Sequence, residues 1–135
     1  MYVSDILVSQ DPMLRGRTYL KKFYPNVEVQ VPATWNYKDL LIVVTDSGGG
    51  GDRSTVLDDV LLTVEVSHPR IAEASRVIRE IVGLLRQWPY DDDGVYWRDV
   101  VGRPAFAPDD GTGVPLYVAT VALSFRKQQV TVNPI

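Results

Sequence analysis

The sequence contains no cysteine and a single histidine, His68. The absence of cysteine excludes disulfide bonds, zinc sites built from thiolates and cysteine nucleophiles. With one imidazole, a metal site based on histidine is nearly excluded as well. We therefore expect no metal site built from cysteine or histidine.

A long apolar run is also missing. No segment approaches the roughly 18 consecutive apolar residues that a membrane-spanning helix needs. Residues 1–10 lack a basic start and carry Asp5 within their apolar stretch, so they do not match a secretory signal. These absences predict a protein that is made and kept in a cytoplasm and that contacts no membrane.

Positive charge is in the minority. The 14 basic residues are outnumbered by 17 acidic residues, which gives a formal net charge of −3. A protein that works by neutralising phosphates normally has an excess of basic residues. Stable binding to nucleic acid is therefore disfavoured.

What the sequence does contain is the composition of an ordinary folded domain. Its 135 residues are 45% hydrophobic and 23% charged, which favours neither disorder nor a coiled coil. A chain of this length buries roughly two thirds of its unfolded surface, enough for one core. We expect a single domain over residues 1–135, with a flexible Gly-rich loop at 46–56 and a polar tail at 127–135.

Strict alternation predicts two long strands. In residues 60–66 and 117–125, apolar side chains recur at every second position, which is typical of a strand with one core-facing side. In the first of these strands the expected core-facing residues are Val60, Leu62, Val64 and Val66.

Three further strands are predicted on weaker patterns. Residues 27–31 alternate valine with polar residues and stop at Pro32, which indicates an edge strand. Residues 40–45 form a continuous apolar run, typical of a central strand. Residues 95–102 are interpreted as a short strand, followed by a loop over 104–115 that is dense in Pro, Asp and Gly.

Two helices are predicted. Asp11-Pro12 has the composition of a helix start, so a first helix is expected over residues 13–23, before Pro25. Its expected buried residues are Leu14, Tyr19, Leu20 and Phe23. A second, longer helix is expected over 70–87, because apolar residues recur there at spacings of three and four: Ile71, Ala74, Ile78, Ile81 and Leu85.

The boundaries of the second helix also follow from local residues. Ser67 or His68 is expected to cap its start, and Trp88-Pro89 is expected to stop it. A capping role for His68 is favoured over general-base catalysis, because no acidic partner or nucleophile is identifiable from the spacing.

Four consecutive glycines occupy positions 48–51. A phosphate-binding P-loop requires Gly-Lys-Ser/Thr at the start of a helix, whereas Asp52-Arg53-Ser54 follows here and a strand comes next. A run of glycines is costly to order, so a mobile loop between two strands is the favoured interpretation.

Two acidic clusters could suggest a cation site. Asp91-Asp92-Asp93-Gly94 and Asp109-Asp110-Gly111 lack the alternating acidic positions and the later glutamate of a calcium loop. Asp and Gly are favoured in turns for backbone reasons, so solvated turns are the preferred interpretation.

Aromatic residues gather around the first acidic turn: Trp88, Tyr90, Tyr96 and Trp97. Most such residues belong to a core, but large aromatic side chains are also preferred anchors of protein interfaces. A surface that stacks on bases would need flanking Lys and Arg, whereas the neighbours here are acidic. The cluster therefore favours protein partners over nucleic acid.

Three stretches carry a resemblance to a known family: Asp-Asp-Val-Leu-Leu-Thr-Val-Glu-Val at 58–66, Ala-Glu-Ala with Ile-Val-Gly-Leu-Leu at 72–74 and 81–85, and Val-Val-Gly-Arg-Pro-Ala-Phe at 100–106 leading to Tyr-Val-Ala-Thr-Val at 117–121. Together they resemble the carboxyl half of the tail terminator and related neck proteins of long-tailed bacteriophages. The first half of the chain is similar to that family only in the order of its elements.

The resemblance implies an α+β fold, with two main helices packed on a mostly antiparallel sheet of four to five strands. It also implies a hexameric ring that caps the head-proximal end of the tail tube in the virion neck. One ring face would contact the tail tube protein and the other a head-completion or connector protein, while DNA passes through without stable binding. Such proteins are not enzymes and need no cofactor.

The surfaces expected to meet protein partners are the glycine-rich loop and the aromatic cluster, namely Gly48, Gly49, Gly50, Gly51, Asp52, Arg53, Trp88, Tyr90, Tyr96 and Trp97. Two alternatives stay open. The chain could be another neck, head-tail connector or minor tail protein, or a small-ligand-binding α+β domain or enzyme that uses the carboxylates of 91–93 and 109–110.

Overall fold

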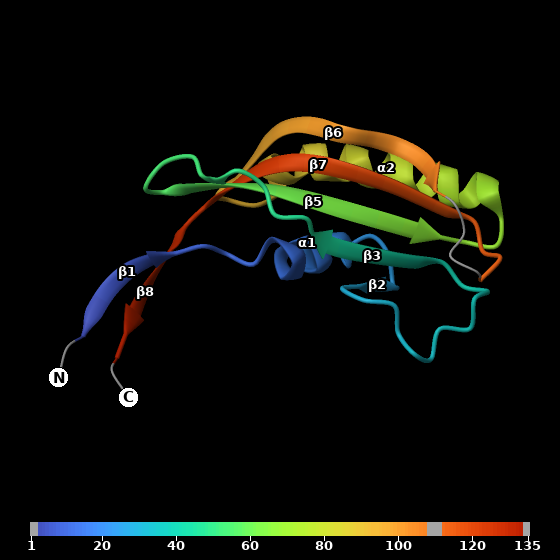
Figure 1. Ribbon diagram of the computed structural model, residues 1–135, viewed down its shortest axis with the longest axis horizontal. Coiled ribbons are helices and arrows are strands. Elements are labelled where there is room, and N and C mark those ends of the chain that lie inside the picture. The colour runs from blue at the N-terminus through green and yellow to red at the C-terminus, as the bar shows by residue number, and fades with distance from the viewer. Residues whose placement is uncertain (1–2, 108–111, 134–135) are drawn as a thin grey trace.

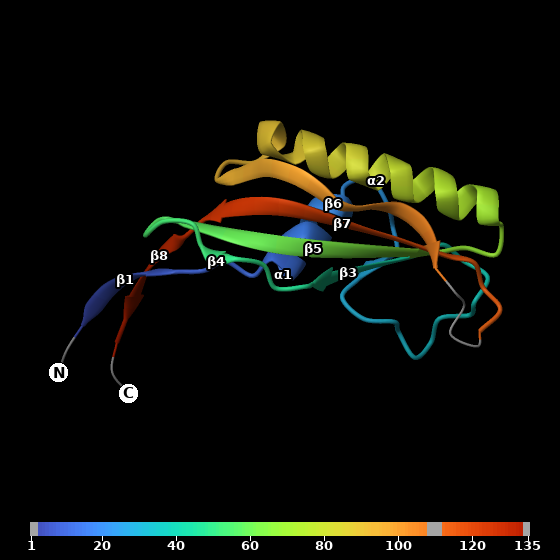
Figure 2. The ribbon, with the colours of Figure 1, turned by 45° about the horizontal axis from the view of Figure 1, so that its top comes forward.

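The computed structural model describes residues 3–107 and 112–133. Two helices lie on one side of a six-stranded sheet, and a separate two-stranded ribbon extends from the end of this body (Figure 1). Turning the molecule shows the long helix above the sheet and the ribbon extending away from it (Figure 2). The expected α+β class with a mainly antiparallel sheet is confirmed.

Five strands form the main path of the sheet. Their order is β2 (Val27–Glu28), β3 (Leu41–Asp46), β5 (Leu57–Ser67), β7 (Leu116–Arg126) and β6 (Val95–Ala107). The short β4 (Gly51–Asp52) pairs with the start of β5, off this path. All these pairs are antiparallel except β2 with β3.

The long central strands follow from their alternating sequences. In β5, each buried residue is followed by a half-buried one, and Val60, Leu62, Val64 and Val66 all face the core as predicted. β7 pairs with β5 along its whole length, from Leu57 opposite Arg126 to Ser67 opposite Leu116. The predicted strand over 40–45 is confirmed as β3, whose first four residues are buried.

Helix α1 (Pro12–Leu20) begins as predicted, because Asp11 Oδ1 accepts hydrogen bonds from the amides of Met13 and Leu14 at 3.0 and 3.2 Å. Its buried residues are Tyr19 and Leu20, as expected, but also Pro12 and Gly16. A Cβ added to Gly16 would lie only 3.0 Å from Leu62 Cδ2, so this glycine lets the helix approach the sheet closely.

The prediction that Leu14 and Phe23 are buried is wrong. Their side chains are 51% and 48% exposed. The close contact at Gly16 turns the face that carries Tyr19 and Leu20 towards the sheet, and the helix ends before Phe23. Two large apolar side chains are thereby left on the surface.

Helix α2 (Ile71–Asp91) continues past its predicted stop. Pro89 lies in its last turn, and the amide of Asp92 still donates to the carbonyl of Trp88 at 3.0 Å. The indole of Trp88 is fully buried, so tertiary packing holds this turn against the local cost of proline. At the other end Ile71 is half exposed, although it was expected in the buried stripe.

Strand β6 is longer than the predicted segment 95–102. It runs to Ala107 and shifts register against β7 at three places, between Trp97 and Asp99, Val100 and Gly102, and Gly102 and Ala105. Pro104 lies within it, which an edge strand tolerates because one side of its backbone needs no ladder hydrogen bonds. The loop predicted over 104–115 is therefore wrong for residues 104–107, which belong to β6, and residues 108–111 are not described.

Two other strand predictions need correction. The segment predicted as a strand over 27–31 pairs only as β2, although it lies at the sheet edge as expected. In the polar tail expected to be loose at 127–135, Gln128–Val132 forms strand β8. β8 pairs antiparallel with β1 (Ser4–Val8), and the two strands make the ribbon.

Candidate functional site

The side of the sheet opposite the helices bears a groove of about 680 Å³. It lies where β6, β7 and the start of β5 meet. Its lining is Arg53, Leu57, Leu61, Tyr96, Trp97, Arg98, Asp99, Val101, Ala122 and Ser124. Three residues that the sequence singled out, Arg53, Tyr96 and Trp97, are thus brought to one groove.

The carboxylate of Asp59 links three side chains that line this groove, those of Arg53, Arg98 and Ser124. Its Oδ1 accepts hydrogen bonds from Arg53 Nε at 2.9 Å and Ser124 Oγ at 2.6 Å, and its Oδ2 lies 2.7 Å from Arg98 Nη1. Burial raises the pKa of Asp59, but these hydrogen bonds and the two guanidinium charges outweigh it, so the pKa lies below its usual value. The carboxylate is ionised and fully engaged, which suits a structural role rather than proton transfer.

Replacing Asp59 with asparagine should lower the free energy of unfolding at pH 7 by about 1 kcal/mol, because two arginines lose their shared charged partner in a position partly screened by water. A depressed pKa contributes stability that is present above the unfolded value of about 3.9 and is lost as the pH falls through the folded value. Urea denaturation of both proteins should therefore give curves that converge below about pH 4. A difference that stays constant from pH 7 to pH 3 would contradict this assignment.

The glycine-rich loop is tied to the sheet in this structure. The amide of Leu61 donates to the carbonyl of Gly48 at 2.8 Å, and Gly51 and Asp52 pair with the start of β5. Asp52 Oδ1 also lies 2.7 Å from Lys127 Nζ, at the junction of β7 and β8. The loop thus braces the base of the ribbon, and its predicted mobility stays a prediction.

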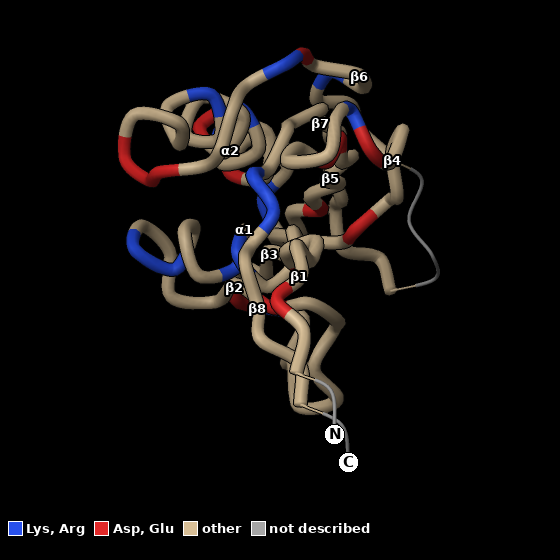
Figure 3. Tube along the Cα trace, turned by 90° about the vertical axis from the view of Figure 1, so that its left-hand side faces the viewer, with Lys and Arg blue, Asp and Glu red and all other residues tan. Residues whose placement is uncertain are grey.

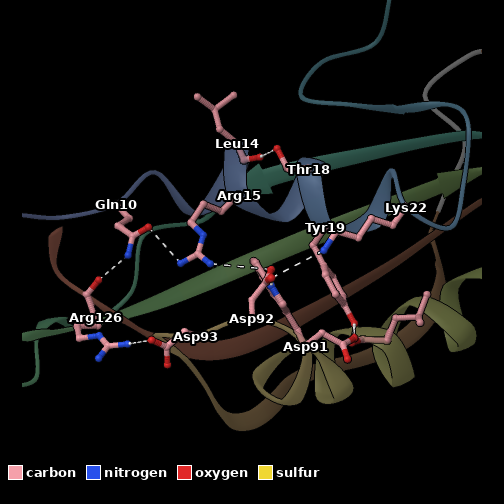
Figure 4. A network of polar contacts seen from close by, with 12 residues as sticks. Gln10, Leu14, Arg15, Thr18, Tyr19, Lys22, Asp91, Asp92, Asp93 and Arg126 are labelled. Carbon is pink, nitrogen blue, oxygen red and sulfur yellow. Dashed lines mark hydrogen bonds and ion pairs between the residues drawn. The ribbon is translucent and has the colours of Figure 1, made fainter.

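In the acidic turn at 91–93, each aspartate side chain contacts another part of the protein (Figure 4). Tyr19 Oη donates to Asp91 Oδ2 at 2.6 Å, Trp88 Nε1 donates to Asp92 Oδ2 at 2.7 Å, and Arg126 Nη2 lies 2.8 Å from Asp93 Oδ2. Each carboxylate has its own partner, so the three do not converge on a common point. The interpretation of this segment as a turn is supported, whereas Asp109 and Asp110 lie outside the described residues.

A shallow depression of about 310 Å³ adjoins this turn. It is lined by Leu14, Arg15, Thr18, Lys22 and Asp92. Within it, the Asp92 carboxylate lies 4.0 Å from Arg15 Nη2 and 3.8 Å from Lys22 Nζ. Asp92 is the only one of the suggested acidic groups that lines this depression, and it is already paired with Arg15 of α1 and with Lys22, which follows the end of α1.

The predicted aromatic cluster is divided by the fold. Trp88 was proposed as an interface anchor, but it is 0% exposed and stacks on Tyr19 with ring centroids 5.0 Å apart. It is a core residue, which corrects that assignment. Tyr90 and Tyr96 are 84% and 44% exposed and remain available to a partner, whereas the ring of Trp97 lies 4.9 Å beneath the guanidinium of Arg86.

Sequence reasoning missed the ribbon, which carries another candidate surface. Residues opposite each other in a two-stranded sheet share a face, and faces alternate along each strand. The register Ile6 with Val130 and Val8 with Gln128 puts one set of apolar side chains together, which we call the apolar ribbon face: Ile6, Val8, Val130 and Val132. The signals available in the sequence were the short apolar run Ile6-Leu7-Val8 and the alternation of Val130 and Val132 about Thr131.

The other face of the ribbon is more polar. There Thr131 Oγ1 donates to Asp5 Oδ1 at 2.6 Å, and Leu7 lies opposite Gln129. Among the described residues of β1 and β8, Asp5 is the only charged one, and the view from the ribbon end shows how little charge it carries (Figure 3).

No helix within residues 3–107 and 112–133 is long and apolar enough to cross a membrane. In the same described ranges, no three His, Asp or Glu side chains are grouped so that they could hold a metal ion. Comparison of the chain with models of known protein families gives no match, and comparison with curated proteins gives none either.

Proposed function

We propose that this protein is a structural subunit that assembles with its own copies into a ring, and that the ring closes the head-proximal end of a phage tail tube. The observation that supports self-assembly best is the ribbon. Ile6, Val8 and Val132 are 44%, 37% and 46% exposed on one face of a two-stranded element outside the body. Clustered apolar side chains on such an element are typical of a protein interface.

The ribbon also lacks the usual protection of exposed strands. Edge strands are commonly blunted by lysine, proline or bulges, which prevent pairing with other chains. β1 and β8 contain neither residue, and their five pairs run without a register shift. A two-stranded ribbon is marginally stable by itself, so contact with another subunit would stabilise it.

The phage assignment rests on the resemblance of three segments in the carboxyl half. In this proposal one face of the ring binds the tail tube protein and the other binds a head-completion or connector protein, in the virion neck. The net charge of −3 suits a channel through which DNA passes without stable binding. No catalytic step and no cofactor form part of the proposal, and assembly takes place in the cytoplasm of the host bacterium.

The same ribbon would serve a subunit at another neck position, in a head-tail connector or in a minor tail protein. The resemblance favours a tail terminator over these other proteins. An experiment that locates the protein within the virion decides between them.

Deleting the gene from the phage that carries it tests the position. We expect free heads together with tail tubes of uncontrolled length in electron micrographs, because nothing stops addition of tube subunits. Expression of the wild-type protein from a plasmid should restore tails of uniform length. Virions of normal tail length in the deletion strain would reject the assignment, and tubes of normal length that fail to join heads would favour another neck position.

A further inference from the structure

We propose that the ribbons of neighbouring copies pair edge to edge, with the free edge of β1 in one copy hydrogen-bonded to the free edge of β8 in the next. This inference rests on the proposed function, because it names the contact that would join successive subunits of the ring. The partner is a second copy of this chain, and the contact is made mainly by backbone groups.

The ribbon has two free edges. In an antiparallel pair, alternate residues direct their N–H and C=O groups towards the partner strand, and the residues between them direct theirs away from it. All five residues of β1 are exposed, and in β8 only Val130 is half-buried. The ribbon also extends away from the main sheet and both helices (Figures 1 and 2). Both edges therefore offer backbone groups with which another strand can pair.

Neither ribbon edge carries a feature that prevents pairing. β8 has no charged residue, and β1 has only Asp5. The Asp5 carboxylate accepts a hydrogen bond from Thr131 Oγ1 at 2.6 Å, so it is held across the ribbon towards β8 and not towards the free edge of β1. The five residue pairs of the ribbon run without a register shift, so no bulge bends either strand.

The two edge strands of the main sheet are less suited to pairing. β6 contains Pro104, which has no N–H to donate, together with Arg98, Arg103 and three register shifts. β2 has only two residues, and the carbonyl of Val27 already accepts a hydrogen bond from Arg17 Nε at 3.0 Å. The two-residue β4 is equally short. The edges that a second copy offers best are therefore those of its own ribbon.

Symmetry decides which two edges meet. Copies in a ring are related by rotation about one axis, so ribbons that run along this axis all have the same direction. The edge that β1 presents to one neighbour then meets β8 of that neighbour. This contact repeats the antiparallel pairing that the two strands have within one copy. Antiparallel pairing of β1 with β1 requires one copy to be turned over, which gives pairs of copies and not a ring.

Edge pairing also brings the apolar ribbon faces together. Neighbouring strands of a sheet share two faces, and side chains on the same face contact their cross-strand neighbours. The register that keeps the apolar faces on one side places Ile6 and Val8 of one copy beside Val130 and Val132 of the next. Hydrogen bonds between backbones set the direction of the contact, and apolar contacts between these side chains add to its stability.

Cross-linking tests which edges meet. The chain has no cysteine, so a protein with Leu7→Cys and another with Gln129→Cys are each singly reactive, and no link can form within one chain. The two positions are opposite each other in β1 and β8, on the more polar face of the ribbon. When the two proteins are mixed and treated with a short bismaleimide, we expect the mixed product to exceed either homodimer by about tenfold.

Arg103→Cys supplies the matched control. Arg103 is an exposed residue of edge strand β6 and precedes Pro104. Mixed with the Gln129→Cys protein, the Arg103→Cys protein should give about a tenth of the linked product that Leu7→Cys gives. Equal yields from the two would show that the ribbon adds to the main sheet of a second copy, and pairing of ribbon with ribbon would be overturned.

Hydrogen exchange distinguishes pairing through edges from contact through a face. In a free copy, the amides of β1 and β8 that point away from the partner strand are open to water, whereas in the assembled protein they are bonded to the next copy. We expect their exchange to slow by about a hundredfold on assembly, as read by NMR after quenching. Amides already bonded within the ribbon are the internal control. An alternating pattern of fast and slow amides that persists in the assembled protein would overturn the proposal.

The outcomes separate this contact from the ring itself. If copies associate while the alternating pattern persists, another surface joins them, and edge pairing is overturned although self-assembly stands. A homodimer of the Leu7→Cys protein as the main product indicates pairs related by a two-fold axis and also overturns it. Wild-type protein that stays monomeric at its solubility limit does the same, and a strand of the tail tube protein would then be the better candidate for the ribbon edges. The ring at the tail end is judged separately, by tail length in the deletion strain.

Discussion

Replacing Trp88 with alanine should lower the free energy of unfolding by about 3–5 kcal/mol. The indole is 0% exposed, stacks on Tyr19 at 5.0 Å and meets the edge of Phe125 at 5.4 Å between ring centroids. Its Nε1 also donates to Asp92 at 2.7 Å. The substitution therefore removes the side chain that joins α2, α1 and β7 and leaves a cavity among them.

Chemical denaturation followed by circular dichroism measures this effect. Tyr90→Ala is the matched control, because Tyr90 is in the same helical turn but 84% exposed, and it should change the free energy of unfolding by less than about 0.5 kcal/mol. Trp88→Phe should be intermediate, since it keeps an aromatic ring but loses the hydrogen bond to Asp92. If Trp88→Ala costs less than about 1 kcal/mol, Trp88 is not the core residue described above.

The second large effect is expected at Gly49. Replacing it with alanine should cost about 3 kcal/mol. Its φ angle is +131°, which L-residues rarely adopt, and an added Cβ would lie 2.6 Å from the carbonyl oxygen of Asp59 and 2.9 Å from the Cα of Val60. These are backbone atoms of β5, so relief of the clash requires the loop to leave the strand.

Gly50 supplies the control for this substitution. Its φ angle is not positive, and the atom nearest to an added Cβ is the Cβ of Asp59, at 3.9 Å. Gly50→Ala should therefore change the free energy of unfolding by less than about 0.5 kcal/mol. Equal effects of the two substitutions in thermal and urea denaturation would show that the loop does not contact β5 in the way described.

Periodicity predicted the elements that have one side in the core. β5 and β7 alternate because each has a helix-covered face, and the spacing of Ala74, Ile78, Ile81 and Leu85 reflects the single face that α2 buries. The hydrophobic effect acts on each of these segments separately, so a local pattern is sufficient to find them.

The remaining errors come from contacts between distant segments. The end of α2 depends on the burial of Trp88 and on Tyr19, 72 residues from its partner Asp91. Which face of α1 is buried depends on Gly16, because this glycine lets the helix approach Leu62 closely. A helical wheel shows only the residues of the helix itself, so it cannot predict this contact. The length of β6 depends on its pairing with β7, which accommodates three register shifts.

The candidate surfaces were predicted only in part, for the same reason. Arg53 and Tyr96 were chosen on separate local grounds, and both line one groove because the segment after β4 and strand β6 lie next to each other there. The ribbon was not predicted, because both its faces contact solvent and its strands lie at opposite ends of the sequence. Only a short apolar run in β1 and two alternating valines in β8 indicated it.

The pairing of β1 with β8 also has a consequence for the order of events during synthesis. Ser4 is paired with Val132, so the first of the described strands gains its partner only when the last of them has been made, while every other described strand already has its neighbour. Closing so distant a contact is slow compared with forming the sheet and helices. The sheet and helices of a nascent chain can therefore form before the ribbon closes, so the surface proposed to contact other copies is completed after the body.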